Sequence, residues 1–144
     1  MTKQDPFRKV GSAYRVELRQ LPDKGNLLLD RISVSTFSSE LKALIEGPLA
    51  ITASPDRPAL LVYSGLKWDD LRPKIEALPN SSQEARRFKR ITLGNAFSLD
   101  EYEPVSIPQT IVRHALLGTS AILISVGEHA AEIWDEQQLN DWED

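Results

Sequence analysis

The stretch Asp100-Glu101-Tyr102-Glu103-Pro104-Val105-Ser106-Ile107-Pro108 decides the fold, because an earlier stretch partly repeats it. The earlier copy reads Leu27-Leu28-Leu29-Asp30-Arg31-Ile32-Ser33-Val34-Ser35, and its residues 31–35 align with residues 104–108 at an offset of 73. An apolar helical run follows each copy. A second match aligns Leu-Leu-Val-Tyr at 60–63 with Ala-Glu-Ile-Trp at 131–134, at an offset of 71. Two matches at nearly one offset predict a duplicated unit of about half the chain.

The composition is that of an ordinary soluble protein. Of 144 residues, 41% are hydrophobic and 26% are charged, which is typical of a globular chain. No apolar run approaches the roughly 20 residues that a membrane span needs. The first residues lack the apolar core of a signal peptide. The absence of cysteine excludes disulfides and thiolate metal sites. We therefore expect a cytoplasmic protein without a membrane partner.

Charge is unevenly distributed along the chain. The net charge is −4, but residues 128–144 hold seven of the 21 acidic residues and no Lys or Arg. The rest carries 17 basic and 14 acidic side chains, a net charge of +3. An acidic tail behind a mildly basic body leaves room for one basic face. A solvated acidic terminus is the alternative interpretation.

The first half is predicted to contain a hairpin, a helix, a second hairpin and a second helix. Residues 1–12 are expected to form an arm. Strands are expected at 16–21 and 27–34 around a turn at 22–26, then at 49–53 and 59–63. Capping residues at 35–40 and the stripe Leu41, Leu44 and Ile45, ended by Gly47-Pro48, predict one helix, and helical spacing predicts another from 68 to 78. Pro79-Asn80-Ser81-Ser82 breaks the second helix, so we place the first domain at 1–79 and the second at 80–144.

The second half repeats this order behind an extra helix at 82–91. A hairpin is expected at 95–99 and 105–107, a helix at 109–117, strands at 121–126 and 130–134, and a final helix at 135–142. The mixture of antiparallel hairpins and helices predicts an α+β fold.

Two groups of basic residues are candidates for binding nucleic acid. On the first hairpin, Arg15, Arg19 and Arg31 lie on the arms and Lys24 lies near the tip, where they can reach phosphates or base edges. Arginines are also ordinary on an exposed strand. The helix at 82–91 holds the densest basic cluster, which consists of Arg86, Arg87, Lys89 and Arg90. A surface helix whose long side chains cover apolar neighbours, or a subunit contact, explains that cluster equally well.

The sequence offers no pattern typical of an enzyme. It has two histidines, His114 on a helix and His129 in a turn, and neither has a partner at motif spacing. A phosphate-binding glycine loop, a nucleophile elbow and metal-ligand spacing are all missing. We expect no catalytic residue, no cofactor and no metal.

Several segments resemble the MraZ family of bacterial transcriptional regulators. The matching pieces in the second half are residues 86–96 (Arg-Arg-Phe-Lys-Arg-Ile-Thr-Leu-Gly-Asn-Ala), Ile107-Pro108, Arg113-His114-Ala115 and Glu132-Ile133-Trp134-Asp135. In the first half they are Ile32-Ser33-Val34, Leu61-Val62-Tyr63 and Trp68. The resemblance spans nearly the whole chain.

The resemblance implies a fold, an assembly and a function. It implies two tandem AbrB-like halves whose swapped hairpins form one small β-barrel with flanking helices. It also implies a homo-oligomeric ring, associated with the nucleoid, that binds double-stranded DNA. The DNA would be short promoter repeats upstream of the division and cell-wall gene cluster, whose transcription the protein would regulate.

The family signature for DNA contact is an Asp, then an Arg four residues later with Gly just before it, once in each half. In the first half Arg31 fits, but Leu27 replaces the Asp and Asp30 the Gly; a second register puts Lys24-Gly25 on the motif and Asn26 in the Arg position. In the second half Asp100 fits, but Glu103 replaces the Gly and Pro104 the Arg. These departures motivate an alternative function: a divergent family member that has lost DNA binding and acts through protein–protein assembly.

Overall fold

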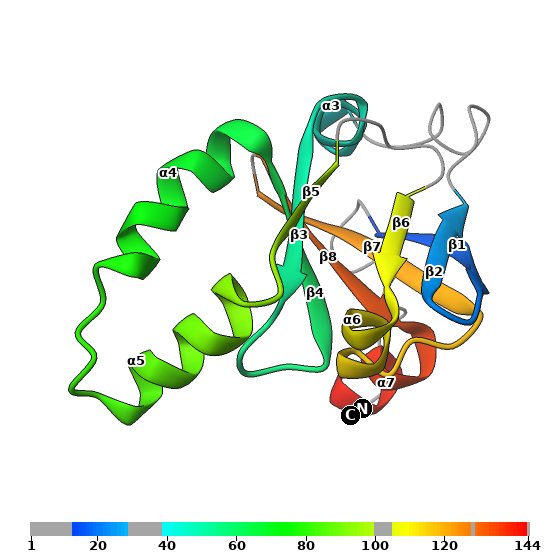
Figure 1. The fold of residues 1–144 in the computed structure, drawn as a ribbon. Coiled ribbons are helices and arrows are strands. Elements are labelled where there is room, and N and C mark those ends of the chain that lie inside the picture. Colours follow the sequence, from blue (N-terminus) through cyan, green and yellow to red (C-terminus); the bar gives the residue numbers. More distant parts are fainter. Residues whose placement is uncertain (1–12, 29–38, 100–104, 128, 144) are drawn as a thin grey trace.

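The computed structural model describes residues 13–28, 39–99, 105–127 and 129–143, and these form a nearly closed eight-stranded antiparallel barrel flanked by helices (Figure 1). The strands are β1 (Ala13–Gln20), β2 (Lys24–Leu28), β3 (Leu49–Ala53), β4 (Ala59–Ser64), β5 (Phe97–Leu99), β6 (Val105–Pro108), β7 (Ser120–Gly127) and β8 (Ala130–Asp135). The helices are α3 (Ser39–Glu46), α4 (Gly65–Glu76), α5 (Gln83–Phe88), the π-helix η1 (Lys89–Leu93), α6 (Gln109–His114) and α7 (Glu136–Glu143). The predicted α+β class and barrel are confirmed.

The sheet has an internal twofold pattern. Its order is β5-β3-β4-β8-β7-β1-β2-β6. When this order is closed into a circle and each strand is exchanged with its counterpart (β1 with β5, β2 with β6, β3 with β7, β4 with β8), every strand keeps the same pair of neighbours. The central β4–β8 ladder pairs Leu61 with Glu132, its own counterpart 71 residues later. The same exchange converts the Leu60–Ile133 pair into the Val62–Ala131 pair. The register therefore confirms the offset of 71, whereas the domain boundary between residues 79 and 80 stays a prediction.

The first hairpin differs from its prediction. The turn is shorter than expected, since the Leu21 backbone N–H donates to the Lys24 carbonyl at 2.8 Å and β2 starts at Lys24. Lys24 is the first residue of β2 and closes the turn that follows Gln20, so its predicted place near the hairpin tip is confirmed, and it also pairs with Pro108 in the β2–β6 ladder. In the twofold exchange the counterpart of β6 is β2. An offset of 73 would place the counterpart of β6 at residues 32–35 and not at Lys24–Leu28, so this offset does not relate β2 to β6. The arm at 1–12, residues 29–34 of the predicted return strand and residues 100–104 of the quoted stretch lie outside the described residues.

Gly25 explains why a turn-like sequence forms a strand. It is buried in β2, and among the described residues only Gly127 is a glycine with positive φ. A Cβ on Gly25 would lie 3.0 Å from Val112 Cγ2 on α6 and 3.2 Å from Leu18 Cδ1. The missing side chain therefore permits close packing of α6 against β2, and a turn conformation is not its role.

The core is divided between the barrel interior and two clusters on the outer wall. Leucine, isoleucine and valine side chains from the strands fill the interior together with residues of α3 and α6. Outside β3 and β4, α4 and η1 cover a cluster around Trp68 and Ile75. Outside β7 and β8, α7 covers a smaller cluster around Trp134 and Leu139.

An aromatic pair recurs in the two outer clusters. Tyr63 stacks on Trp68 with 6.0 Å between ring centroids, and Trp134 lies 5.7 Å from Trp142. In each pair the first ring comes from a central strand and the second from the helix that follows it. In the sequence, each half has an aromatic residue near the end of a strand and a tryptophan after it. In the structure, these two residues are in contact in both halves.

Replacing Gly25 with Ala should destabilise the protein by about 1–3 kcal/mol, because the new methyl group overpacks the contact with Val112. Chemical denaturation measures the change. Gly47→Ala is the matched control, since a Cβ there meets only a backbone oxygen at 4.0 Å. Equal stability of Gly25→Ala and the native protein would show that α6 does not pack as described.

Candidate nucleic-acid interface

The outer side of β1, β2 and β6 is the part of the barrel wall on which no described helix builds a hydrophobic cluster (Figure 1). Alternation along the strands points apolar residues such as Val16 and Leu27 into the interior. The outward positions are polar or exposed. We call them the β1–β2–β6 face: Arg15, Glu17, Arg19, Lys24, Asn26, Ser106 and Pro108.

One row of this face crosses all three strands. Arg19 pairs with Asn26 in the β1–β2 ladder, and Asn26 pairs with Ser106 in the β2–β6 ladder. Neighbouring strands lie about 4.8 Å apart, so the row presents a guanidinium, an amide and a hydroxyl at regular spacing. Arg19 is exposed and forms no ion pair in the part of the chain that the structure describes. Such groups contact phosphates and base edges in protein–DNA complexes.

Asn26 is the centre of the row. Its side-chain oxygen is shielded from solvent and has no hydrogen-bond partner among the described residues. A buried acceptor without a donor is costly, and native structures contain few of them. The sequence placed Asn26 in the family's Arg position in one register, and β2 is the strand that carries this register.

Arg15 is tied to α7 at the border of the face. Its Nη2 donates to Glu136 Oε2 at 2.7 Å, and Ser120 Oγ donates to Glu136 Oε1 at 2.7 Å. The Ser120 hydrogen bond, followed by the bond and charge of Arg15, holds the pKa of Glu136 below its ordinary value. Glu136 therefore stays ionised and partly neutralises Arg15, although the Arg15 side chain is 58% exposed.

The other predicted cations of the first hairpin contribute less. Lys24 is half-buried on the same face. Arg31 lies outside the described residues. Of the four hairpin cations, the structure therefore brings three to one face: Arg15, Arg19 and Lys24.

The basic cluster on α5 and η1 forms no single site. Arg86 Nη1 donates to the Asn80 carbonyl at 2.6 Å, and Lys89 Nζ donates to Asn80 Oδ1 at 2.8 Å. These two cations fasten the loop before α5. Arg87 and Arg90 are exposed and have no partner within the described ranges. Figure 1 shows α5 and the β1–β2 hairpin at opposite sides of the molecule, so the two predicted groups do not form one surface.

Sequence reasoning did not select Ser106 and Glu136 for the interface. Ser106 lies at an outward position of β6, and strand alternation was the signal that predicted its direction. Glu136 is 121 residues from Arg15, and no sequence signal predicts that pair.

The chain is 39% identical over 114 residues to "Transcriptional regulator MraZ" of Marinobacter nauticus, covering 76% of this chain and 75% of that protein. A protein of the same name from Pseudomonas putida is 32% identical over 123 residues, with 83% and 78% covered. One from Saccharophagus degradans is 34% identical over 103 residues, with 70% and 69% covered. No protein-family model matches the chain.

The chain belongs to the MraZ family. The predicted family is therefore confirmed, and the shared name of these relatives describes them as transcriptional regulators. These relatives are named as regulators and not as enzymes. In the described ranges, no helix is long and apolar enough to cross a membrane.

The Arg15–Glu136 pair predicts a pH-dependent contribution to stability. The folded-state pKa of Glu136 lies below its ordinary value of 4.5, so its stabilisation is complete above that value and is lost as pH falls through the folded pKa. Glu136→Gln should therefore be less stable than the native protein at neutral pH, by at most about 1 kcal/mol, and the difference should vanish in acid.

Urea denaturation from neutral pH to about pH 3 measures this difference. Asp141→Asn is the control, because it removes a carboxylate from α7 that accepts from Gln137 and leaves Arg15 unchanged. A Glu136→Gln difference that grew as the pH fell would contradict the assignment.

Proposed function

We propose that this MraZ-family chain is a DNA-binding regulator that docks its β1–β2–β6 face on promoter DNA. The observation that carries the proposal is the row Arg19–Asn26–Ser106 on a polar wall without a helix cluster over it. Antiparallel strands can enter the major groove, where side chains read base edges. Short promoter repeats upstream of the division and cell-wall gene cluster are the proposed target.

Each of the three groups in the row suits a different contact with DNA. The Arg19 guanidinium matches a phosphate or the O6 and N7 atoms of guanine. The Asn26 side chain would have to rotate outward to pair with N6 and N7 of adenine, because its oxygen is shielded from solvent. Ser106 can donate to a phosphate. The row can therefore both position the protein and read sequence.

The charge on the face limits the affinity of a single copy. Three cations share the face with Glu17, and Arg15 is also paired with Glu136. Each phosphate neutralised contributes about −0.9 to the slope of log K against log salt, so about two net contacts give a slope near −2 per copy. Such binding is weak. The proposed homo-oligomeric ring would raise it by presenting several faces to repeated DNA boxes.

A second function, protein–protein assembly without DNA, is favoured by one apolar surface. Leu66 at the start of α4 is 79% exposed and borders a cavity of about 410 Å³ that Pro48 and His129 also line. Large apolar side chains exposed beside a cavity are typical of contact surfaces. The acidic C-terminal segment gives this alternative little support, because Glu132 and Asp135 are buried and Glu136 pairs with Arg15.

Replacing Arg19 with Ala should weaken binding to DNA from the chain's own upstream region at least about fivefold and reduce the salt slope by about one for each copy bound. The reason is the loss of one phosphate or guanine contact. Fluorescence anisotropy over a range of salt concentrations measures both quantities.

Arg87→Ala is the matched control, an exposed arginine without a partner in the described chain but on α5. It should bind DNA like the native protein. If Arg87→Ala lost affinity and Arg19→Ala did not, the interface would lie on α5 and η1. If the native protein assembled but bound no DNA at low salt, the assembly function would replace the proposal.

A further inference from the structure

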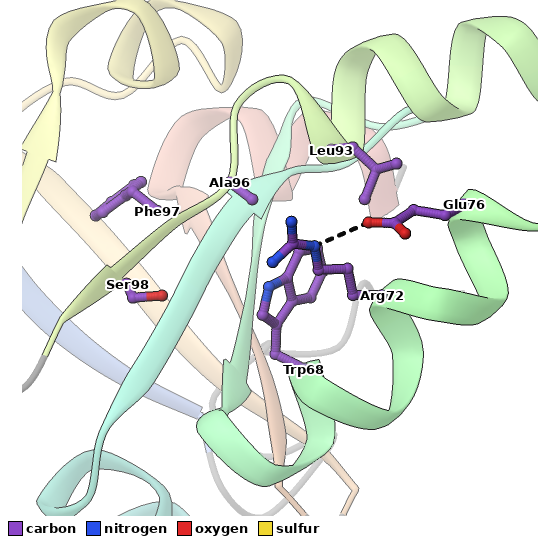
Figure 2. Close-up of a pocket in the computed structure, with 7 residues that line it drawn as sticks. All are labelled: Trp68, Arg72, Glu76, Leu93, Ala96, Phe97 and Ser98. Atoms are coloured by element: carbon purple, nitrogen blue, oxygen red, sulfur yellow. Dashed lines mark hydrogen bonds and ion pairs between the residues drawn. The ribbon is translucent and has the colours of Figure 1, made fainter.

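A second cavity lies away from the β1–β2–β6 face, between α4, η1 and β5 (Figure 2). Its volume is about 230 Å³. The residues that line it are Trp68, Arg72, Glu76, Leu93, Ala96, Phe97 and Ser98. This volume lies below the roughly 300–1,000 Å³ of sites for drug-sized ligands, so the cavity suits a smaller molecule.

One wall of the cavity is a stripe along α4. Trp68, Arg72 and Glu76 are spaced four residues apart, so they lie on one side of the helix. Trp68 is buried and is held by its stacking on Tyr63, which gives the cavity a fixed apolar floor. Arg72 and Glu76 lie at the rim, with side chains 62% and 52% exposed, and solvated ligands can therefore reach them.

The opposite wall is built by the π-helix. Helices of this type are rare and often occur at functional sites. Thr92 fastens η1 to β3, because its Oγ1 donates to the Ala53 carbonyl at 3.3 Å and its own carbonyl accepts from Thr52 Oγ1. Asn95 Nδ2 donates to the Ile91 carbonyl at 2.8 Å and holds the exit of the π-helix. The wall that carries Leu93 and Ala96 is thus fixed before any ligand arrives.

The charged pair at the rim has unused hydrogen-bonding capacity. Arg72 donates from Nε to Glu76 Oε1 at 2.9 Å, as the dashed line in Figure 2 shows. A guanidinium has five N–H donors, so the four on Nη1 and Nη2 have no partner among the described residues. Glu76 Oε2 likewise has no donor within the described chain. A ligand can therefore bind both groups without breaking the pair.

We propose that this cavity binds a small zwitterion, an α-amino acid with a short side chain. Its carboxylate would accept from the Nη atoms of Arg72, and its ammonium group would donate to Glu76. A simple anion would meet repulsion from Glu76, and a simple cation would meet repulsion from Arg72. A ligand whose two charged groups flank a single carbon atom satisfies the two groups together, and its short side chain packs on Trp68 and Leu93.

Two-dimensional NMR of the ¹⁵N-labelled full chain tests the site without DNA, so its outcome is independent of the DNA proposal. L-alanine and L-serine are the probes, and acetate and ethylamine are the single-charge controls. The Trp68 indole N–H signal should shift saturably with both amino acids and much less with acetate or ethylamine. Arg72→Gln and Glu76→Gln should each weaken amino-acid binding at least about tenfold, because each removes a charge-assisted contact.

Lys74→Gln is the matched control. Lys74 lies on the same helix in an exposed pair with Asp70 at 3.2 Å, but does not line the cavity, so this variant should bind amino acids like the native protein. Absence of a saturable shift in the native protein would overturn the site. Acetate binding as tightly as L-alanine, or native-like binding by Arg72→Gln, would overturn the zwitterion assignment.

Discussion

The pairing of β4 with β8 is the constraint on which the rest of the structure depends. It joins the two repeats at Leu61 and Glu132, the pair that the twofold exchange leaves in place. Glu132 is a buried carboxylate, and a buried charge is tolerated only when it is paired and hydrogen-bonded. Arg57 Nη1 lies 2.9 Å from its Oε2, and Trp134 Nε1 donates to its Oε1 at 2.9 Å. Burial raises the pKa of Tyr63, and the negative charge of Glu132 raises it further.

The outward residues of the strands determine which walls of the barrel the helices cover. The outward residues of β4, β7 and β8 include Tyr63, Ile122 and Trp134, which are apolar enough to hold helices against them. The outward residues of β1 and β2 are charged or polar instead. Packing a helix there would bury charges such as Arg19 without partners, which is costly. The polar wall is therefore a direct consequence of the alternation along β1 and β2, and it is the surface on which the proposed DNA contact rests.

Much of this fold could be predicted from the sequence, because periodicity, Gly and Pro mark the elements from α3 to α7. The register of the first hairpin could not. Residues 27–34 form the more apolar run, whereas the polar Lys24, Gly25 and Asn26 belong to β2 because β6 and α6 pack against them. The division of one predicted helix into α5 and a π-helix also had no local signal, although Gly94, where a Cβ would collide with the Arg90 carbonyl, marks its end.

For the interface, the sequence showed the cations but not their environment. Strand alternation brings Arg15 and Arg19 to one face, yet the pairing of Arg15 with Glu136 depends on tertiary structure. Arg86 and Lys89 looked like binding residues, and their side chains instead fasten Asn80. The number of basic residues in the sequence therefore overestimates the basic surface. The residues that remain available on the barrel form a short polar row.

Hydrogen–deuterium exchange of the protein bound to its own upstream DNA tests the central claim most directly. We expect protection on binding to concentrate in β1, β2 and β6, with α5 and η1 exchanging as in the free protein. Protection confined to α5 and η1, with the β1–β2–β6 face unchanged, would contradict it.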